Sequence, residues 1–189
     1  MRILINGKEQ PEEEFADLSG QEIVKKVNER WPDCIIEKVI FEGDEVPLIY
    51  FQEEVESSTR DWEVEFILSQ REEVVKRELE RVKDYLPRLE ATVEEMSNFF
   101  AGDNKTKARK RYRSALEGME WMQTRLVKVV RMKEDEEIKN RFQDELREYH
   151  RAVKEALIAY QQGRDGRLCQ LFEEEILFYL HTMLDIIRE

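Results

Sequence analysis

The sequence has few of the residues that build redox, zinc or nucleophilic sites. Its two cysteines, Cys34 and Cys169, lie far apart, and neither belongs to a CxxC motif or has a histidine nearby. A zinc site or a thioredoxin-like centre is therefore not indicated, and we expect two reduced, buried thiols. There is also no GxSxG motif, no GxxxxGK[ST] motif and no glycine-rich loop leading from a strand into a helix. Nucleophilic hydrolysis and phosphate-loop chemistry are thus not indicated.

Histidine is as scarce as cysteine, with His150 and His181 as the two copies. Helical bundles that hold two metal ions take a Glu-x-x-His pair from each of two helices. The residues three positions before the histidines are Arg147 and Phe178, so this pair is missing twice. At 100° per residue His181 falls in the polar stripe of its helix, and we expect it at the surface, paired with Asp185 one turn later. The sequence predicts no metal, no cofactor and no enzyme.

Long apolar runs are absent as well. No stretch approaches the roughly 20 apolar residues that cross a bilayer. The first twenty residues are acidic and contain no apolar block of the kind found in signal peptides. We therefore expect a cytoplasmic protein without a membrane segment. The composition, 41% apolar and 39% charged with 7 Gly and 4 Pro, is typical of long amphipathic helices.

Charge is unevenly distributed along the chain. Residues 1–69 contain 7 Lys/Arg and 18 Asp/Glu, a net charge of −11, whereas the remainder contains 24 and 25, a net charge of −1. A field of this sign repels nucleic acid and anionic lipid. We therefore expect a protein partner or a homodimer before a nucleic acid.

Residues 1–69 are interpreted as an acidic α+β domain. The stretches "RILIN" and "CIIEKVIFEG" predict strands, and Gly43 with Asp44 predicts a turn before the apolar stretch "EVPLIYF". In "DWEVEFIL" apolar and mainly acidic residues alternate, which predicts a strand with one buried face. That face comprises Trp62, Val64, Phe66 and Leu68. Between the first two strands, Ser19 and Glu22 have the spacing of a capping box at a helix start.

Residues 70–189 are interpreted as an antiparallel four-helix bundle, because apolar residues recur there in steps of three and four. The four apolar seams are Val75, Leu79, Val82, Leu86, Leu89, Val93, Met96 and Phe100; Ala108, Tyr112, Ala115, Met119, Met122, Leu126 and Val129; Ile138, Phe142, Leu146, Tyr149, Val153, Leu157 and Tyr160; and Cys169, Phe172, Ile176, Tyr179, Met183 and Ile186. Pro87 leaves the phase of the first seam intact, so we expect a kink in a continuous helix.

The ends of these helices have local signals. The phase breaks in "RMKEDEE", where we expect the second helix to end and the third to begin. Gly102 and Gly163 predict helix ends, and Asp103 and Asp165 are candidate N-caps for the helices that follow. The overall fold class predicted is therefore α+β, with a small mixed unit followed by the bundle.

A basic run opens the second predicted helix. Its residues are Lys105, Lys107, Arg109, Lys110, Arg111 and Arg113. Positive charge at the positive end of a helix dipole is unfavourable, so an acidic group should compensate it. The acidic residues 1–69 of the same or a second chain are one such partner. RNA or another phosphate ligand is the alternative, with Tyr112 available to stack on a base, and a solvated run is the third interpretation.

The fourth predicted helix has more apolar residues than one seam requires. Leu171 and Phe178 are expected to point away from the main apolar face, so that either residues 1–69 or another molecule covers them. Phe99 and Trp121 lie beside their seams, and aromatic residues are common anchors in protein contacts. We therefore take Phe99, Trp121, Leu171 and Phe178 as candidate partner-binding residues.

The run "YLPRLEATVEEMSNFFAGD", the later "ALEGMEWMQ" and the terminal "FEEEILFYLHTMLDII" resemble a group of uncharacterised bacterial helical proteins. More distantly, the helical pattern is similar to that of flagellar export chaperones, small cytosolic proteins that hold an export substrate until it is secreted. This resemblance implies an adaptor or chaperone that binds a client protein through the bundle. The alternative is a nucleic-acid or phosphate-ligand binder that uses the basic run.

Overall fold

The computed structural model describes residues 1–55, 62–102 and 104–189, except for the side chain of Glu54. The chain divides into two compact units, Met1–Val74 and Val75–Glu189, called here the N-terminal unit and the helical unit. A small N-terminal unit with a mixed sheet, followed by a region of several helices, confirms the coarse fold prediction.

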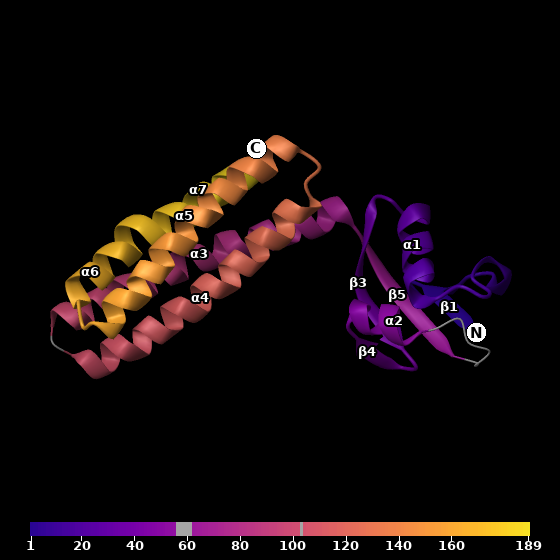
Figure 1. Cartoon of the computed structure of the whole chain (residues 1–189), viewed down its shortest axis with the longest axis horizontal. Helices are drawn as coiled ribbons and strands as arrows, with labels where there is room; N and C mark the ends of the chain where they lie inside the picture. The colour runs from indigo at the N-terminus through magenta and orange to yellow at the C-terminus, as the bar shows by residue number, and fades with distance from the viewer. Residues whose placement is uncertain (56–61, 103) are drawn as a thin grey trace. The chain divides into compact units, whose positions relative to one another are not determined.

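The N-terminal unit contains a five-stranded sheet in the order β2-β1-β5-β3-β4 (Figure 1). Its elements are β1 (Arg2–Ile5), β2 (Lys8–Glu9), the 3-10 helix η1 (Glu12–Glu14), α1 (Gly20–Arg30), β3 (Cys34–Phe41), β4 (Asp44–Val46), α2 (Leu48–Glu54) and β5 (Glu63–Gln70). β1 and β5 are parallel, and the other neighbouring strands are antiparallel.

One face of this sheet forms the core, as the alternation in β5 predicts. Val64 and Phe66 are fully buried, and Phe51 of α2 and Ile23 of α1 pack into the same core. The predicted capping box at the start of α1 is confirmed: the Glu22 N–H donates to the Ser19 hydroxyl, and the Ser19 N–H donates to the Glu22 carboxylate. The capping box thus begins α1, and the alternation of apolar residues in β5 determines which face of that strand is buried.

The stretch "EVPLIYF" departs from the predicted extended structure. The hairpin turn lies at Glu42 and Gly43, both with positive φ, one residue earlier than expected. β4 ends after Val46, Pro47 follows, and α2 begins at Leu48. Proline has no N–H for a strand ladder and suits a position at a helix start. Its backbone restriction therefore outweighs the strand preference of the apolar residues that follow it.

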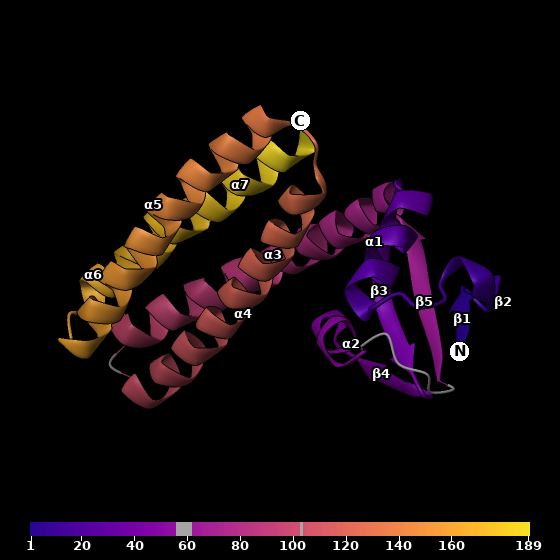
Figure 2. The same ribbon diagram turned by 45° about the vertical axis from the view of Figure 1, so that its right-hand side comes forward.

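The long helices of the helical region lie lengthwise beside one another (Figure 2). The elements are α3 (Arg71–Ala101), α4 (Lys105–Met132), α5 (Glu136–Gln161), α6 (Asp165–Gln170), the π-helix η2 (Leu171–Ile176) and α7 (Leu177–Arg188). The last three are consecutive and form one rod. α3 is continuous through Pro87, and the break in "RMKEDEE" separates α4 from α5, as predicted.

The helix ends follow the glycine prediction more closely than the aspartate prediction. α3 ends before Gly102, and Gly163, with φ +66°, follows α5. Asp103 lies outside the described residues, and the N-cap of α4 is Asn104, whose side chain accepts from the Lys107 N–H. Asp165 is the first residue of α6 and not its cap.

The third apolar seam drifts out of phase in α5. Phe142 and Tyr149 are buried as predicted, but further along the buried positions are Ala152, Ala156 and Ala159, while Leu157 is 47% exposed. The expected seam takes steps of 4, 4, 3, 4, 4 and 3 residues, which average about 3.7. The buried positions Ile138, Ala152 and Ala159, and likewise Phe142, Tyr149 and Ala156, are instead spaced by multiples of seven residues, which is 3.5 per turn. From Val153 onward the expected seam therefore runs one residue ahead of the buried positions.

The π-helix changes which residues of the last rod are buried. A π turn closes on the fifth residue instead of the fourth and shifts the phase of the residues after it. Leu180, which follows the π-helix, is fully buried where the expected seam placed Tyr179, while Phe178 is 59% exposed. Leu171, at the start of the π-helix, is also fully buried, because it shares one helix face with the buried Leu168 and Phe172. The prediction that Leu171 points away from the main face is therefore wrong.

Candidate interaction surfaces of the helical unit

Phe178 is the most exposed large apolar side chain in the described part of the helical unit. Its ring lies edge-on to Tyr179, with ring centroids 5.6 Å apart. Leu157 and Ile158 of α5 are also exposed. The prediction that Phe178 faces outward is confirmed, and Leu157 and Ile158 are exposed residues that the seam pattern did not identify.

Phe99 and Trp121 are both half-buried and already have intramolecular partners. The Lys107 ammonium lies 5.5 Å from the centre of the Phe99 ring. The Trp121 ring lies 4.8 Å from that of Tyr85, with the Arg125 guanidinium 5.3 Å from the Trp121 ring. Because rings and cations of the helical unit cover these faces, a partner could contact only the remaining edges. Leu171, the fourth candidate, is buried and offers no contact surface.

The basic run finds part of its compensation within the helical unit. Arg111 pairs with Glu95 at 2.6 Å, and Lys105 lies 3.9 Å from Asp165. Acidic residues of the helical unit itself thus pair with these two cations, and compensation by residues 1–69 of this or a second chain stays a prediction. Arg109, Lys110 and Arg113 are exposed, and none of them forms an ion pair with a described residue. These three remain the part of the run that an external anion could contact.

Tyr112 cannot stack on a base, contrary to the sequence interpretation. It is buried, with its ring stacked on Tyr160 at 4.2 Å and close to Phe172. Its hydroxyl has no hydrogen-bond partner among the described residues. Burial, together with the nearby Tyr160, raises the pKa of this hydroxyl. Tyr112 packs in the core, because the 3.6-residue period of the helix turns it inward while its basic neighbours face water.

His181 is exposed as predicted, but its partner is different. Its Nε2 lies 2.6 Å from the Glu90 carboxylate of α3, while Asp185 pairs with Arg188. Asp185 lies one turn away on the same helix, but packing against α3 brings the Glu90 carboxylate into contact with His181 instead. His150 contacts Gln123 through Nε2 at 2.9 Å.

Glu78 is a feature that the sequence reasoning missed. It is 1% exposed and is the buried charged residue of the described chain. Arg125 Nη1 donates to its two carboxylate oxygens at 3.0 and 2.8 Å, and Lys128 Nζ donates to Oε1 at 3.0 Å. Arg81, one turn along α3, lies 3.6 Å away. The carboxylate therefore joins α3 to α4 through two cations, Arg125 and Lys128, while Arg81 is a third cation on its own helix.

The charge state of Glu78 follows from these contacts. Burial alone would raise the pKa of the carboxyl, but hydrogen bonds and charge from Lys128 and Arg125 outweigh it and lower the pKa below its usual value. A sequence signal existed: Arg125 and Lys128 are three residues apart and share one helix face. Their acidic partner could not be chosen, because several glutamates of α3 are exposed and equally near in sequence.

A second charged network lies beside the π-helix. Arg167 Nη2 donates to Glu155 at 3.1 Å and to Glu175 at 3.0 Å, which ties α5 to the last rod. A pocket of about 250 Å3 adjoins it and is lined also by Ile158 and Arg164. Because two carboxylates already occupy the Arg167 guanidinium, an anionic ligand would have to displace them. This pocket is a weak candidate for ligand binding.

The described residues offer neither a metal cluster nor a membrane span. They contain no group of three or more His, Cys, Asp or Glu placed to hold a metal ion. Within that same part of the chain, no helix combines the length and apolarity that crossing a bilayer requires. Cys34 and Cys169 are free and half-buried, and burial raises the pKa of the Cys169 thiol.

Comparison with known proteins bears on the helical unit. No match was found among curated proteins or among solved structures. The family model described as Domain of unknown function (DUF8042) matches residues 77–185, which is more than half of the chain and lies within the helical unit. The chain therefore belongs to the DUF8042 family.

Proposed function

We propose that the helical unit is an antiparallel four-helix bundle that binds another protein as a cytoplasmic, non-enzymatic adaptor or export-type chaperone. The rods α3, α4, α5 and α6–η2–α7 would be its four helices. Residues of all four, such as Leu89, Met119, Phe142 and Ile176, belong to one apolar core, which supports this description. The family match to the same part of the chain makes this unit the natural place for the shared function.

The exposure of Phe178 carries the proposal. An exposed phenylalanine on a rod whose other large apolar residues are mostly buried is a ready anchor, because covering such a side chain contributes roughly 1.5 to 3 kcal/mol. The hydrogen-bonded pair of His181 and Glu90 lies about one turn from it. A polar rim around an apolar anchor is the usual arrangement of a protein interface. A client segment with its own apolar anchor residue fits this chemistry.

The test compares full-length protein with a Phe178→Ser variant. Each is immobilised, incubated with bacterial lysate at low salt, and the retained proteins are identified by mass spectrometry. Ile49→Ser is the matched control, because Ile49 is 57% exposed on the other unit. A client retained by the wild type and by Ile49→Ser, and lost with Phe178→Ser, is expected. Equal retention by all three proteins, or retention of nothing by a monomeric wild type, would overturn the proposal.

A nucleic-acid or phosphate-ligand binder is the second candidate. Three exposed cations, Arg109, Lys110 and Arg113, without ion-pair partners among the described residues favour it. The burial of Tyr112 removes the stacking residue that this function would use. Fluorescence anisotropy with a labelled single-stranded RNA at low salt tests it. Binding that weakens with salt and disappears when the three cations become glutamine would establish this function, and no binding would end it.

A further inference from the structure

We propose that residues 34–38 of β3 accept an extended basic peptide as an added strand. β4 covers only the other end of β3, where Val39 pairs with Val46 and Phe41 pairs with Asp44. On the opposite side, β5 pairs with β3 from Cys34 to Phe41. Among the described residues no strand pairs with the first half of β3 on the β4 side. Such an edge presents backbone groups to which an extended peptide can bind.

Pro47 explains why this edge is open. β4 runs antiparallel to β3, so its next residues would extend the ladder along residues 34–38. Instead Pro47 follows β4, and the chain enters α2 at Leu48. Proline cannot donate a ladder hydrogen bond. The sheet therefore loses its outer strand midway along β3, and Leu48 lies beside the uncovered part.

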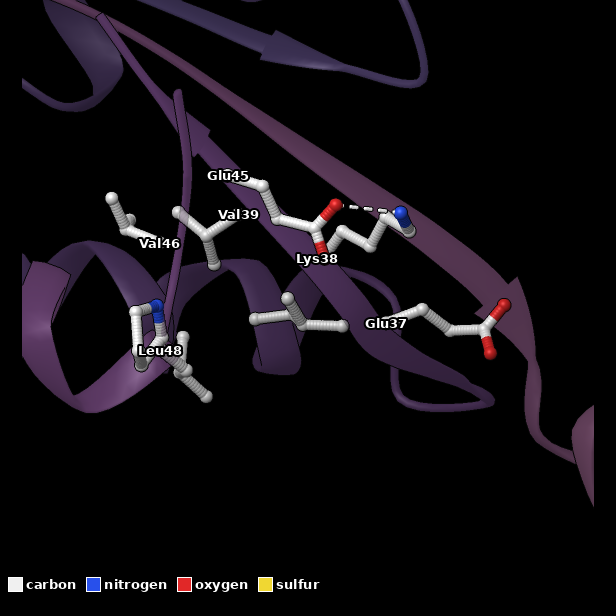
Figure 3. Close-up of a pocket in the computed structure, with 8 residues that line it drawn as sticks. Glu37, Lys38, Val39, Glu45, Val46 and Leu48 are labelled. Atoms are coloured by element: carbon white, nitrogen blue, oxygen red, sulfur yellow. Dashed lines mark hydrogen bonds and ion pairs between the residues drawn. The ribbon is translucent and has the colours of Figure 1, made fainter. Parts of the chain in front are cut away.

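Two pockets adjoin the open edge and share Ile36 and Leu48. The first, of about 360 Å3, also contains Val39 and Val46 (Figure 3). The second, of about 440 Å3, also contains Cys34. Side chains of an added strand alternate between the two faces of a sheet. Every second residue of the peptide would thus reach these pockets, and apolar side chains such as valine suit their lining.

The bulge in β3 limits how long the new ladder can be. The pairing with β5 skips one residue between Ile36 and Lys38, and the Ser69 hydroxyl donates to the Glu37 carboxylate at 2.5 Å. A bulge twists the strand and interrupts regular pairing. Only a short backbone ladder can form, so the two pockets must supply much of the affinity and the sequence preference.

Charge selects the occupant. Glu37 and Glu45 line the first pocket, and residues 1–69 have a net charge of −11. Lys38 pairs with Glu45 at 2.6 Å (Figure 3), so these two charges offset each other, and Arg71 donates to the Pro32 carbonyl oxygen at 2.8 Å. The attraction for a basic peptide therefore comes mainly from the net negative charge of residues 1–69. A second copy of this chain would bring the same negative charge to the edge. A peptide that alternates Lys or Arg with apolar residues is complementary.

This site is independent of the proposed client surface, because it lies in the other unit and outside residues 77–185 of the family match. The probe is a fluorescein-labelled hexapeptide of alternating lysine and valine, titrated into the full-length protein and followed by anisotropy. Three comparison peptides replace lysine with glutamate, replace valine with glycine, or carry N-methyl groups on alternate backbone nitrogens. N-methylation removes ladder hydrogen bonds and leaves side chains intact.

We expect the lysine–valine peptide to bind, and each comparison peptide to bind at least about tenfold more weakly. For the N-methylated peptide this factor corresponds to the loss of one or two hydrogen bonds. Backbone amide NMR shifts should centre on residues 34–38. Glu45→Lys should weaken binding several-fold, whereas Glu13→Lys, an equal charge change at an exposed position outside both pockets, should not. Equal binding of the N-methylated peptide, shifts centred elsewhere, or a dimer of the free protein formed through this edge would overturn the proposal.

Discussion

Replacing Glu78 with glutamine should destabilise the helical unit, because the substitution removes the charge of α3 that pairs with Arg125 and Lys128 of α4. Glutamine has nearly the same size, so packing is preserved and the loss reports the electrostatic contacts. Its amide nitrogen would also face the donors of Arg125 and Lys128, where the carboxylate now accepts at 2.8 to 3.0 Å. Glu80→Gln, an exposed position on the same helix, is the matched control.

The expected loss is moderate. Removing one partner of a fully buried ion pair costs about 3 to 5 kcal/mol. Arg125 and Lys128 are 30% and 40% exposed and can regain water, so we expect about 2 kcal/mol, close to one hydrogen bond with a charged group. For a chain of this size that corresponds to about 4 to 8 °C in Tm. Urea unfolding followed by far-UV circular dichroism, together with thermal melts, measures it.

The sign of the pH dependence follows from the lowered pKa of Glu78. Its contribution is present above the unfolded-state pKa, near the ordinary value of 4.5, and is lost as pH falls through the lower folded-state pKa. The stability difference between wild type and Glu78→Gln should therefore be constant near neutral pH and shrink below about pH 4.5. A variant as stable as Glu80→Gln at neutral pH, or a difference that grows with acid, would refute the reasoning.

Three further comparisons test the packing. Gly20→Ala should destabilise the N-terminal unit by about 3 kcal/mol, because its Cβ would overlap the backbone of α2, while Gly166→Ala has open space and should stabilise by up to about 1 kcal/mol. Leu171→Ala should cost about 2 to 5 kcal/mol and Phe178→Ala less than about 1 kcal/mol, given their burial; equal losses would contradict this difference in burial. Tyr112→Phe should leave stability unchanged or raise it by about 1 kcal/mol, since the buried hydroxyl has no described partner. Urea unfolding measures all of them, and a large loss for Tyr112→Phe would reveal a missing contact.

Short-range patterns were sufficient for much of the helical unit. The first two apolar seams predict the buried residues of α3 and α4, including Leu89 and Met119. The Ser19 and Glu22 capping box forms as expected. These features depend on residues within one or two turns of each other. Their interactions are present in the sequence before any tertiary contact exists.

The candidate surfaces were harder to predict, because small errors in phase accumulate along a rod. Leu157 and Leu171 exchanged expected places, one becoming exposed and the other buried. In α5 the expected seam advanced by about 3.7 residues per step, whereas the buried positions recur every 3.5. In the last rod the expected seam began at the half-buried Cys169, although Leu168 is the buried residue and Leu171 shares its face. Phe178 was assigned correctly because it lies opposite the apolar face under either phase.

The sequence by itself determined where α1 begins and where α3 and α5 end, which face of most helices is apolar, and how acidity is divided between the two units, because each depends on neighbours along the chain. Only the tertiary structure decided that Glu78 is the carboxylate joined to Arg125, that Glu90 is the partner of His181, and that half of β3 has an open edge. Such pairings arise between segments distant in sequence. Many charged residues could satisfy them equally well, and packing of the core selects among them.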